Sequence, residues 1–459
     1  MLSPPSITPD RDKLLTLSKV LIGLFLLVGI ALVYWSVLRA GALLARDDNP
    51  RRLEAAFRVQ RGALLDAEGQ ILAQNEGPPE RQRRSYPLPA GGHAVGFYSI
   101  LHGTAGAEAS FNSELSGAPD SALSEWWRTL QKVPQTGRDV QLALRYDLQE
   151  TAVKMLDGER GAALLLELPR DGRDLAWVRA LASAPGFDAN TLDESFEELA
   201  AAQDAPLLDR VTQGQYQPGL LLQPFILAAA VNSGEIRLSD VVESANEPVT
   251  INGSELRCIA EPPQPATWAD VLAFRCPAPM LGLADRLGAG GLDVAFSSFG
   301  LNRAPQFELD TAAVASAGVD DPLLAGIGQE DLALTPLQLG LAMGALAGDG
   351  RLPQPQLGAA IRDKSGEWQP LRLASEAGEA VTPATARAVR SILPQVDGVS
   401  EFRAVVLSGP AGSRNAWYSG IWHGEDADYV AIAVLENNPE QAEAEQVGRR
   451  LLALARESE

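Results

Sequence analysis

The sequence predicts an α+β protein whose body is attached to a membrane by one N-terminal helix. Between Val20 and Leu38 the chain carries no charged residue. Tyr34 and Trp35 lie near the end of this run and Arg39 follows it, a composition typical of a single transmembrane helix. In the remainder, strand-like segments lie at both ends with helical segments between them, which predicts a sheet assembled from distant parts of the chain.

The length and apolar content predict two or three domains. The chain has 459 residues, of which 46% are hydrophobic, enough to bury a substantial core. We expect a short N-terminal tail (1–13), a transmembrane helix (14–38), a small β-rich domain (39–139) and a larger α+β domain (140–459).

Two alternatives concern the apolar N-terminal segment. The sequence Ala40-Gly41-Ala42 has the small-x-small form of a signal-peptide cleavage site, although the apolar run is longer than a typical signal core. Three basic residues precede the run and five follow it before residue 60, so the positive-inside count alone would place the body in the cytoplasm. Long domains cross membranes largely regardless of that count.

The charge and the few cysteines and histidines exclude several classes of function. The formal net charge is -21, and residues 91–459 carry 26 Lys and Arg against 50 Asp and Glu. An acidic body repels phosphates, so a nucleic-acid partner has no electrostatic support. The three histidines are scattered and no HExxH or CxxC spacing occurs, so we expect no metal and no cofactor. Cys258 and Cys276 form either a disulfide or two unpaired apolar thiols.

The smaller domain is predicted to begin with a β-hairpin. Residues 57–74 alternate around an Asp-x-x-Gly turn at Asp66. The segment from Glu76 to Gly92 is rich in Pro, Gly and Arg, which indicates a surface connection whose basic residues face solvent.

The larger domain is predicted to combine strands at both ends with buried helices between them. A strand passing into an amphipathic helix covers Val140 to Met155, and a Pro-Arg-Asp-Gly turn after Leu168 joins two strands. Apolar runs with Gly stops predict helices after Tyr216 and after Leu334. The last part predicts three strands and a closing helix, in residues 404–412, 415–424, 428–438 and 440–456.

Several motifs resemble, in order and spacing, the class B penicillin-binding proteins, the membrane-anchored peptidoglycan D,D-transpeptidases of bacteria. The segment Arg61-Gly62 to Ala73 is similar to the family's RG-x-I-x-D-x-x-G-x-x-LA pattern, and residues 84–87 and 103–106 are similar to the pedestal of its elongation-type members. Gly326-Ile-Gly328-Gln329 followed by residues 334–338 (LTPLQ) carries the most specific part of the likeness. The resemblance implies a pedestal domain below a transpeptidase-like domain, an antiparallel sheet flanked by helices.

The first catalytic motif of that family is degenerate. The family carries Pro-Gly-Ser-x-x-Lys at a helix start, where the serine is acylated and the lysine, three residues on, accepts its proton. The corresponding stretch contains Leu220 in place of the serine and Gln223 in place of the lysine. Leucine has no nucleophilic atom and glutamine is no base near neutral pH, so neither residue can perform its step.

The second and third motifs are degenerate as well. The Ser-x-Asn motif is replaced by Arg275, Cys276 and Pro277, and Lys-Thr-Gly-Thr is replaced by Leu407, Ser408, Gly409 and Pro410. In the family the residue after that glycine donates its backbone N–H to the oxyanion, and proline has no N–H. The loss of one such donor costs roughly 10²–10³ in rate.

Substitute catalytic groups have little support in the sequence. Between residues 140 and 459 the only lysines are Lys154 and Lys364, and no motif brings either near a serine. His423 could in principle act as a base for Ser408. The sequence around Ser408 lacks the Gly-x-Ser-x-Gly elbow that usually presents such a serine, so a solvent-exposed loop histidine is the simpler interpretation. Cys276 as a nucleophile lacks a histidine partner. We therefore predict no catalytic residue.

The resemblance implies a role in bacterial cell-wall synthesis. We expect a catalytically inactive homologue that acts as a scaffold or regulator, a single-pass protein of the bacterial cell membrane with most of the chain outside the cytoplasm. The implied partners are the membrane, a polytopic peptidoglycan glycosyltransferase, other cell-wall synthesis proteins and peptidoglycan itself. The alternatives are a noncanonical acyl-transfer or hydrolytic enzyme, or a sensor of wall fragments that uses the remodelled cleft.

Overall fold

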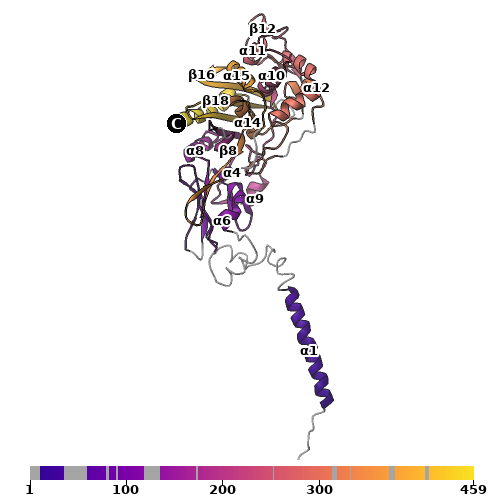
Figure 1. The fold of residues 1–459 in the computed structure, drawn as a ribbon, viewed down its shortest axis with the longest axis vertical. Helices are drawn as coiled ribbons and strands as arrows, with labels where there is room; N and C mark the ends of the chain where they lie inside the picture. Colours follow the sequence, from indigo (N-terminus) through magenta and orange to yellow (C-terminus); the bar gives the residue numbers. More distant parts are fainter. Residues whose placement is uncertain are drawn as a thin grey trace, which may run out of the picture. The chain divides into compact units, whose positions relative to one another are not determined.

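The protein is described by a computed structural model, in which two compact units separate. The first unit comprises residues 1–59 and 78–82, and the second comprises 60–77 and 83–459. Each is described by itself (Figure 1). The described residues are 11–35, 59–78, 82–88, 91–117, 135–171, 174–251, 253–312, 318–330, 332–371, 378–408 and 413–459.

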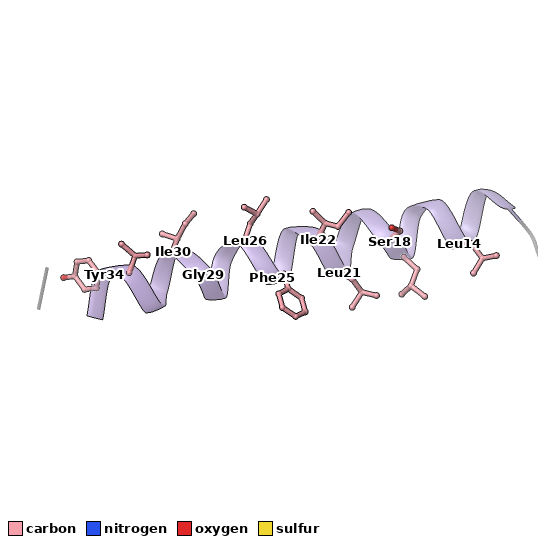
Figure 2. A pocket seen from close by; sticks show the side chains of 11 residues that line it. Leu14, Ser18, Leu21, Ile22, Phe25, Leu26, Gly29, Ile30 and Tyr34 are labelled. Atoms are coloured by element: carbon pink, nitrogen blue, oxygen red, sulfur yellow. The ribbon is translucent and has the colours of Figure 1, made fainter. Parts of the chain in front are cut away.

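The first unit contains one long apolar helix, α1 (Arg11–Val33), long and apolar enough to cross a membrane. It begins before the predicted start at residue 14, and residues 36–38 of the predicted span lie outside the described residues. Figure 2 shows its side chains projecting from a single helix, so the hollow of about 910 Å³ between Leu14 and Tyr34 is the flank of that helix alone. Phe25 is 81% exposed. An apolar surface of this kind is stable in lipid, as single-pass anchoring requires.

The pedestal contains a six-stranded sheet in the order β15-β14-β6-β1-β2-β3. The predicted hairpin is confirmed, because β1 and β2 pair antiparallel around the turn at Asp66. The Asp66 carboxylate closes this turn by accepting the N–H groups of Glu68 and Gln70. Residues 358–370, which follow the larger part of the chain, return to extend this sheet. The strands are β1 (Leu64–Leu65), β2 (Ile71–Glu76), β3 (Arg83–Ser85), β6 (Val140–Leu142), β14 (Gly358–Arg362) and β15 (Trp368–Pro370).

A buried ion cluster holds the pedestal together. Glu108, on α5 (Gly106–Ser110), is fully buried. Its two carboxylate oxygens pair with Arg61 at 2.7 Å and Arg84 at 2.6 Å, whose side chains are each 3% exposed. The prediction that the basic residues between Glu76 and Gly92 face solvent is wrong for Arg84. This residue lies in a strand that pairs with β2, and its charge is compensated inside the domain.

The central sheet of the larger part has seven strands in the order β13-β8-β7-β19-β18-β17-β16. The predicted hairpin of β7 and β8 and the three consecutive strands β17, β18 and β19 are confirmed by their antiparallel pairing. Only β13 joins its neighbour in parallel. The strands are β7 (Gly161–Pro169), β8 (Leu175–Ala184), β13 (Gln354–Gln356), β16 (Gln395–Val396), β17 (Val399–Leu407), β18 (Arg414–His423) and β19 (Ala427–Leu435).

Helices cover both faces of this sheet (Figure 1). Because side chains alternate along a strand, Ala163 and Leu165 of β7 pack in the cluster under α8 (Tyr146–Met155) and α16 (Gln441–Glu457). Leu164 and Leu166 pack in the main core under α14 (Pro336–Ala347). All three helices were predicted and are confirmed.

Five further helices form the main core beside the sheet. They are α10 (Gln223–Asn232), α11 (Trp268–Ala273), α12 (Ala278–Ser298), α13 (Pro322–Gly326) and α15 (Pro383–Ile392). The other helices of the described residues are α4 (Gly92–Val95), α6 (Asn112–Ser116) and α9 (Leu192–Ala201). Thr267 and Thr335 begin α11 and α14 with capping boxes, which satisfy N–H groups that a helix start leaves unpaired. Cys258 and Cys276 form a disulfide, which decides between the two states that the sequence left open.

We expect Glu108→Gln to destabilise the protein strongly. Removal of the buried negative charge leaves Arg61 and Arg84 uncompensated in the interior, which costs roughly 3 kcal/mol or more. The loss is measured by urea titration of the detergent-solubilised protein. Glu114→Gln is the matched control, because its contact with Arg138 is long (3.9 Å) and partly exposed and should contribute less than about 1 kcal/mol. Equal losses in the two variants would contradict a stabilising role for the cluster.

Candidate functional site

The degenerate first motif lies at the junction of two helices. The 3-10 helix η3 (Gly219–Leu222) carries Leu220 and leads directly into α10, which begins at Gln223. Leu221 and Leu222 are buried in the main core, whereas Leu220 is half-buried at its edge. At the position where the sequence predicts a replaced nucleophile, an apolar side chain therefore packs against the core.

Two glycines bring the start of η3 against its neighbours. Gly219 has a φ of +54°, and a Cβ at this position would lie 2.8 Å from the side chain of Val406 on β17. Its N–H donates to the carbonyl of Gly328 at 3.0 Å. Gly328 has a φ of +65°, and a Cβ there would lie 2.2 Å from the carbonyl oxygen of Gly219. The backbones of Gly219 and Gly328 meet too closely for any side chain, and Gly219 packs against β17 through the side chain of Val406.

Gln223 faces the second motif. Its side chain is fully buried, and Nε2 donates to the carbonyl oxygen of Cys276 at 2.9 Å. Oε1 has no hydrogen-bond partner among the described residues. The residue in the place of the lysine therefore joins two segments of the site but supplies neither a positive charge nor a base.

Arg275 joins the second motif to β17. It lies in the turn between α11 and α12 with a φ of +54°, and its guanidinium donates to the carbonyl of Arg403. The same group lies over the Phe402 ring, 5.8 Å from the centroid. Arg275 is 5% exposed, and burial, aided by the positive charge of Arg403, lowers its pKa to about 10. A long cationic side chain therefore bridges two walls of the site.

The third motif begins at the end of β17. Leu407 is the last residue of the strand, and the N–H of Ser408 donates to the carbonyl of Ser413 at 2.8 Å. Gly409 and Pro410 lie outside the described residues. The missing oxyanion donor at Pro410 therefore stays a prediction from the sequence.

The structure separates His423 from Ser408. In the antiparallel pair of β17 and β18, Leu407 opposes Arg414 while Val399 opposes Trp422, so the two residues lie at opposite ends of the strands, about 30 Å apart. His423 Nδ1 lies 2.7 Å from Asp428. Burial alone would raise the pKa of Asp428, but hydrogen bonds from His423 and Arg170 lower it. His423 belongs to an ion cluster that lines a cavity of about 650 Å³ at that end.

The other candidate replacements for the catalytic groups, two lysines and a cysteine, are not placed to act as a base or a nucleophile at this site. Lys154 lies on the surface of α8, where it pairs with Glu150, and Lys364 lies in the exposed turn between β14 and β15. Cys276 is bonded to Cys258 and so has no free thiol. Within the described ranges no group of three or more His, Cys, Asp and Glu side chains is arranged to hold a metal ion.

The sequence did not predict a cluster of hydrogen bonds and ion pairs around Glu436, next to the site. Glu436, after the end of β19, accepts hydrogen bonds from Arg210 and Tyr216 at 2.8 Å each and pairs with Arg160. Burial raises the pKa of Tyr216, and the Glu436 carboxylate raises it further, so the phenol remains a donor. Arg210 and Tyr216 lie 226 and 220 residues from Glu436 in the sequence, so only the fold reveals their common partner.

Two family profiles match the chain. The profile described as penicillin binding protein transpeptidase domain matches residues 176–453, and that of the penicillin binding protein A dimerisation domain matches residues 61–140. The peptidoglycan D,D-transpeptidase PbpA of Mycolicibacterium smegmatis is 26% identical over 443 residues, 87% of this chain and 88% of that protein. MrdA of Acinetobacter baumannii is 33% identical over 146 residues, 29% of this chain and 21% of that protein.

Solved structures share the fold. Penicillin-binding protein A from M. tuberculosis, as an imipenem acyl-enzyme complex, has a TM-score of 0.77 at 21% identity, with 88% of this chain and 99% of that chain covered. The D,D-transpeptidase domain from Eggerthella lenta has a TM-score of 0.73 at 22% identity, with 87% and 99% covered.

We expect Gly328→Ala to destabilise the protein, because the new Cβ would collide with the backbone of Gly219 and the residue needs a positive φ. The predicted loss is at least about 2 kcal/mol. Gly282→Ala is the control: it lies inside α12, before the kink at Gly288, with nothing within 4 Å of its Cβ, so it should gain about 0.5–1 kcal/mol. Thermal unfolding of both variants gives the result, and a neutral Gly328→Ala would show that the contact is not required.

Proposed function

The chain belongs to the penicillin-binding protein transpeptidase family of peptidoglycan synthesis, and we propose that it is a catalytically inactive member that acts as a scaffold or regulator. The observation that carries this proposal is the state of the first motif. Acylation needs a nucleophile and a base one helical turn apart, and these positions hold Leu220 and a fully buried Gln223. No alternative pair of groups is brought together near them in the described part of the chain.

The other two motifs support the same proposal. Where Ser-x-Asn would supply a hydroxyl and a substrate-holding amide, Arg275 extends to β17 and Pro277 begins a helix. Where Lys-Thr-Gly-Thr would supply a cation and an oxyanion donor, Leu407, Ser408 and Gly409 precede a proline without an N–H. Several independent losses at one site favour a lost transpeptidase over a noncanonical acyl-transfer enzyme that relocated its chemistry.

The proposed partners are a polytopic peptidoglycan glycosyltransferase and other cell-wall synthesis proteins. The parts that would contact them, the apolar helix α1 and the pedestal, need none of the missing catalytic groups. We further propose that most of the chain lies outside the cytoplasm. The disulfide between Cys258 and Cys276 supports this orientation, because such bonds persist in oxidising compartments.

Fluorescent penicillin tests the proposed inactivity. We expect no covalent labelling of the full-length protein, because Leu220 offers no oxygen to acylate. The variant Leu220→Ser with Gln223→Lys should also stay unlabelled while Pro410 remains, because the oxyanion lacks one donor. An active class B relative labelled in the same gel is the positive control. Stoichiometric labelling of the wild type would refute inactivity, and labelling of the double variant would refute the oxyanion argument.

Co-purification from detergent-solubilised membranes tests the proposed scaffold. We expect a polytopic glycosyltransferase to co-purify with the full-length protein, and the yield to fall at least about tenfold when residues 11–35 are replaced by an unrelated transmembrane helix. The variant Leu220→Ala is the matched control and should retain the partner, since the proposed contacts avoid the former active site. If no such partner is recovered with the intact helix, the scaffold proposal is wrong.

A further inference from the structure

The turn formed by Arg275, Cys276 and Pro277 contacts both sides of the degenerate site at once. On one side the carbonyl of Cys276 accepts the buried Gln223 side chain of α10. On the other side Arg275 donates to Arg403 of β17 and covers the Phe402 ring. A single short segment therefore joins the wall that would carry the nucleophile to the strand that would line the opposite wall.

The conformation of this turn is costly by itself. Arg275 adopts a left-handed backbone conformation that residues with a side chain disfavour. Its guanidinium is buried, and its Nε lacks a hydrogen-bond partner within the part of the chain that the structure describes. Oε1 of Gln223, buried on the other side of Cys276, is unpartnered in the same sense. Buried polar atoms without partners oppose the state that buries them.

A covalent bond holds the turn in place against these costs. Cys276, next to Arg275, is bonded to Cys258, which lies 18 residues earlier in the loop after β11 (Ser254–Leu256). The N–H of Ile259 donates to the carbonyl of Phe274 at 2.9 Å, so the backbones of the two segments also meet. A cross-link of this kind restricts the alternative conformations that the turn could otherwise reach.

We propose that residues 275–277 form a disulfide-held latch, which covers the edge of β17 at the degenerate site in the oxidised protein and releases it when the Cys258–Cys276 bond is reduced. The inference concerns the regulation of the same site and rests on the proposed function in treating that site as noncatalytic. In the reduced state Arg275 withdraws from β17, and the edge of that strand at Arg403 becomes accessible.

The chemical step is a thiol–disulfide exchange with an external dithiol. One thiolate of the reductant attacks a sulfur of the Cys258–Cys276 bond, which forms a mixed disulfide and releases the first cysteine. The second thiol of the reductant then attacks the mixed disulfide and releases the second cysteine. Cys258 and Cys276 leave as two thiols, having gained two electrons and two protons, and the reductant becomes a disulfide. No other reactant is needed.

Release would expose a specific edge. The carbonyl of Arg403 points away from β18, to Arg275, whereas the N–H of Ser408 points the other way, to Ser413. Because the backbone groups of successive residues face opposite sides of a strand, Val405 and Leu407 also direct theirs away from β18. Strand β16 pairs with β17 only at Val399 and Ser400. Arg275 donates a hydrogen bond to the Arg403 carbonyl, so in the closed latch this carbonyl is not available to pair with an added strand.

Hydrogen–deuterium exchange of the full-length protein in detergent tests the latch. On addition of dithiothreitol we expect amide exchange in peptides covering 272–278 and 400–407 to accelerate at least about tenfold, while β7 and β19 stay protected. In the oxidised protein, Arg275→Ser should accelerate exchange in 400–407 by a similar factor. Arg257→Ser, an exposed arginine next to Cys258, is the matched control and should change neither peptide.

Each outcome decides the inference. Unchanged exchange in 400–407 after reduction, or equal acceleration of β7 and β19, would overturn the latch, because the bond would then have no effect there or only a general effect on stability. Unchanged exchange in Arg275→Ser would show that the arginine does not close the strand edge. If that variant does not fold, the reduction experiment on the wild-type protein still decides. Penicillin labelling tests the proposed inactivity and the exchange experiment tests the latch, so either proposal can fail while the other stands.

Discussion

The placement of the site depends on the carboxylate of Glu436 at the end of the central sheet. It receives Arg210, which is fully buried, together with Tyr216 and Arg160. Arg210 in turn donates to the carbonyls of Asp204 and Ala205, so the segment before η3 is tied to the sheet along its length. A charge buried in this way must stay paired, since removal of one partner leaves the others uncompensated. The position of η3 follows from that requirement, from the Gly219–Gly328 contact and from the packing of Gly219 against Val406 of β17.

None of these constraints involves the side chains that a transpeptidase uses. The ion pairs and hydrogen bonds of Glu436 hold the segment that leads into η3, and the contact of Gly219 with Gly328 joins two backbones. The side chains at positions 220 and 223 take part in neither, so they can change without loss of these contacts. Leu220 adds apolar contact at the edge of the core, and the amide of Gln223 retains one hydrogen bond across the site. A frame built on such contacts explains how a chain can keep the family's fold while the proposed loss of chemistry costs it little stability.

The fold was predictable wherever local pattern and tertiary environment agree. The hairpin at Asp66, the β7–β8 hairpin, helices α10 and α14 and the three C-terminal strands all follow from alternation, turn residues and caps near in sequence. The failures involve partners far apart in the chain. Arg84 appeared solvated because its partner Glu108 lies 24 residues away, and nothing local to residues 358–370 indicated that they extend the pedestal sheet.

The site was predictable in its identities and not in its contacts. A motif comparison identifies which residues stand at 220, 223, 275 and 407, but it is silent on what a replaced side chain does in the folded protein. Arg275 shows the difference: as a replacement it suggests only a lost hydroxyl, whereas its length and its positive φ allow it to reach the Arg403 carbonyl. The disulfide is a similar case, because two cysteines in a sequence show neither whether they are bonded nor where the bond lies in the fold. Their location beside Arg275 becomes informative only when the buried, unpartnered atoms around the same turn are known. A substitution that removes chemistry can thus add a structural contact, and that contact depends on neighbours that a motif comparison does not include.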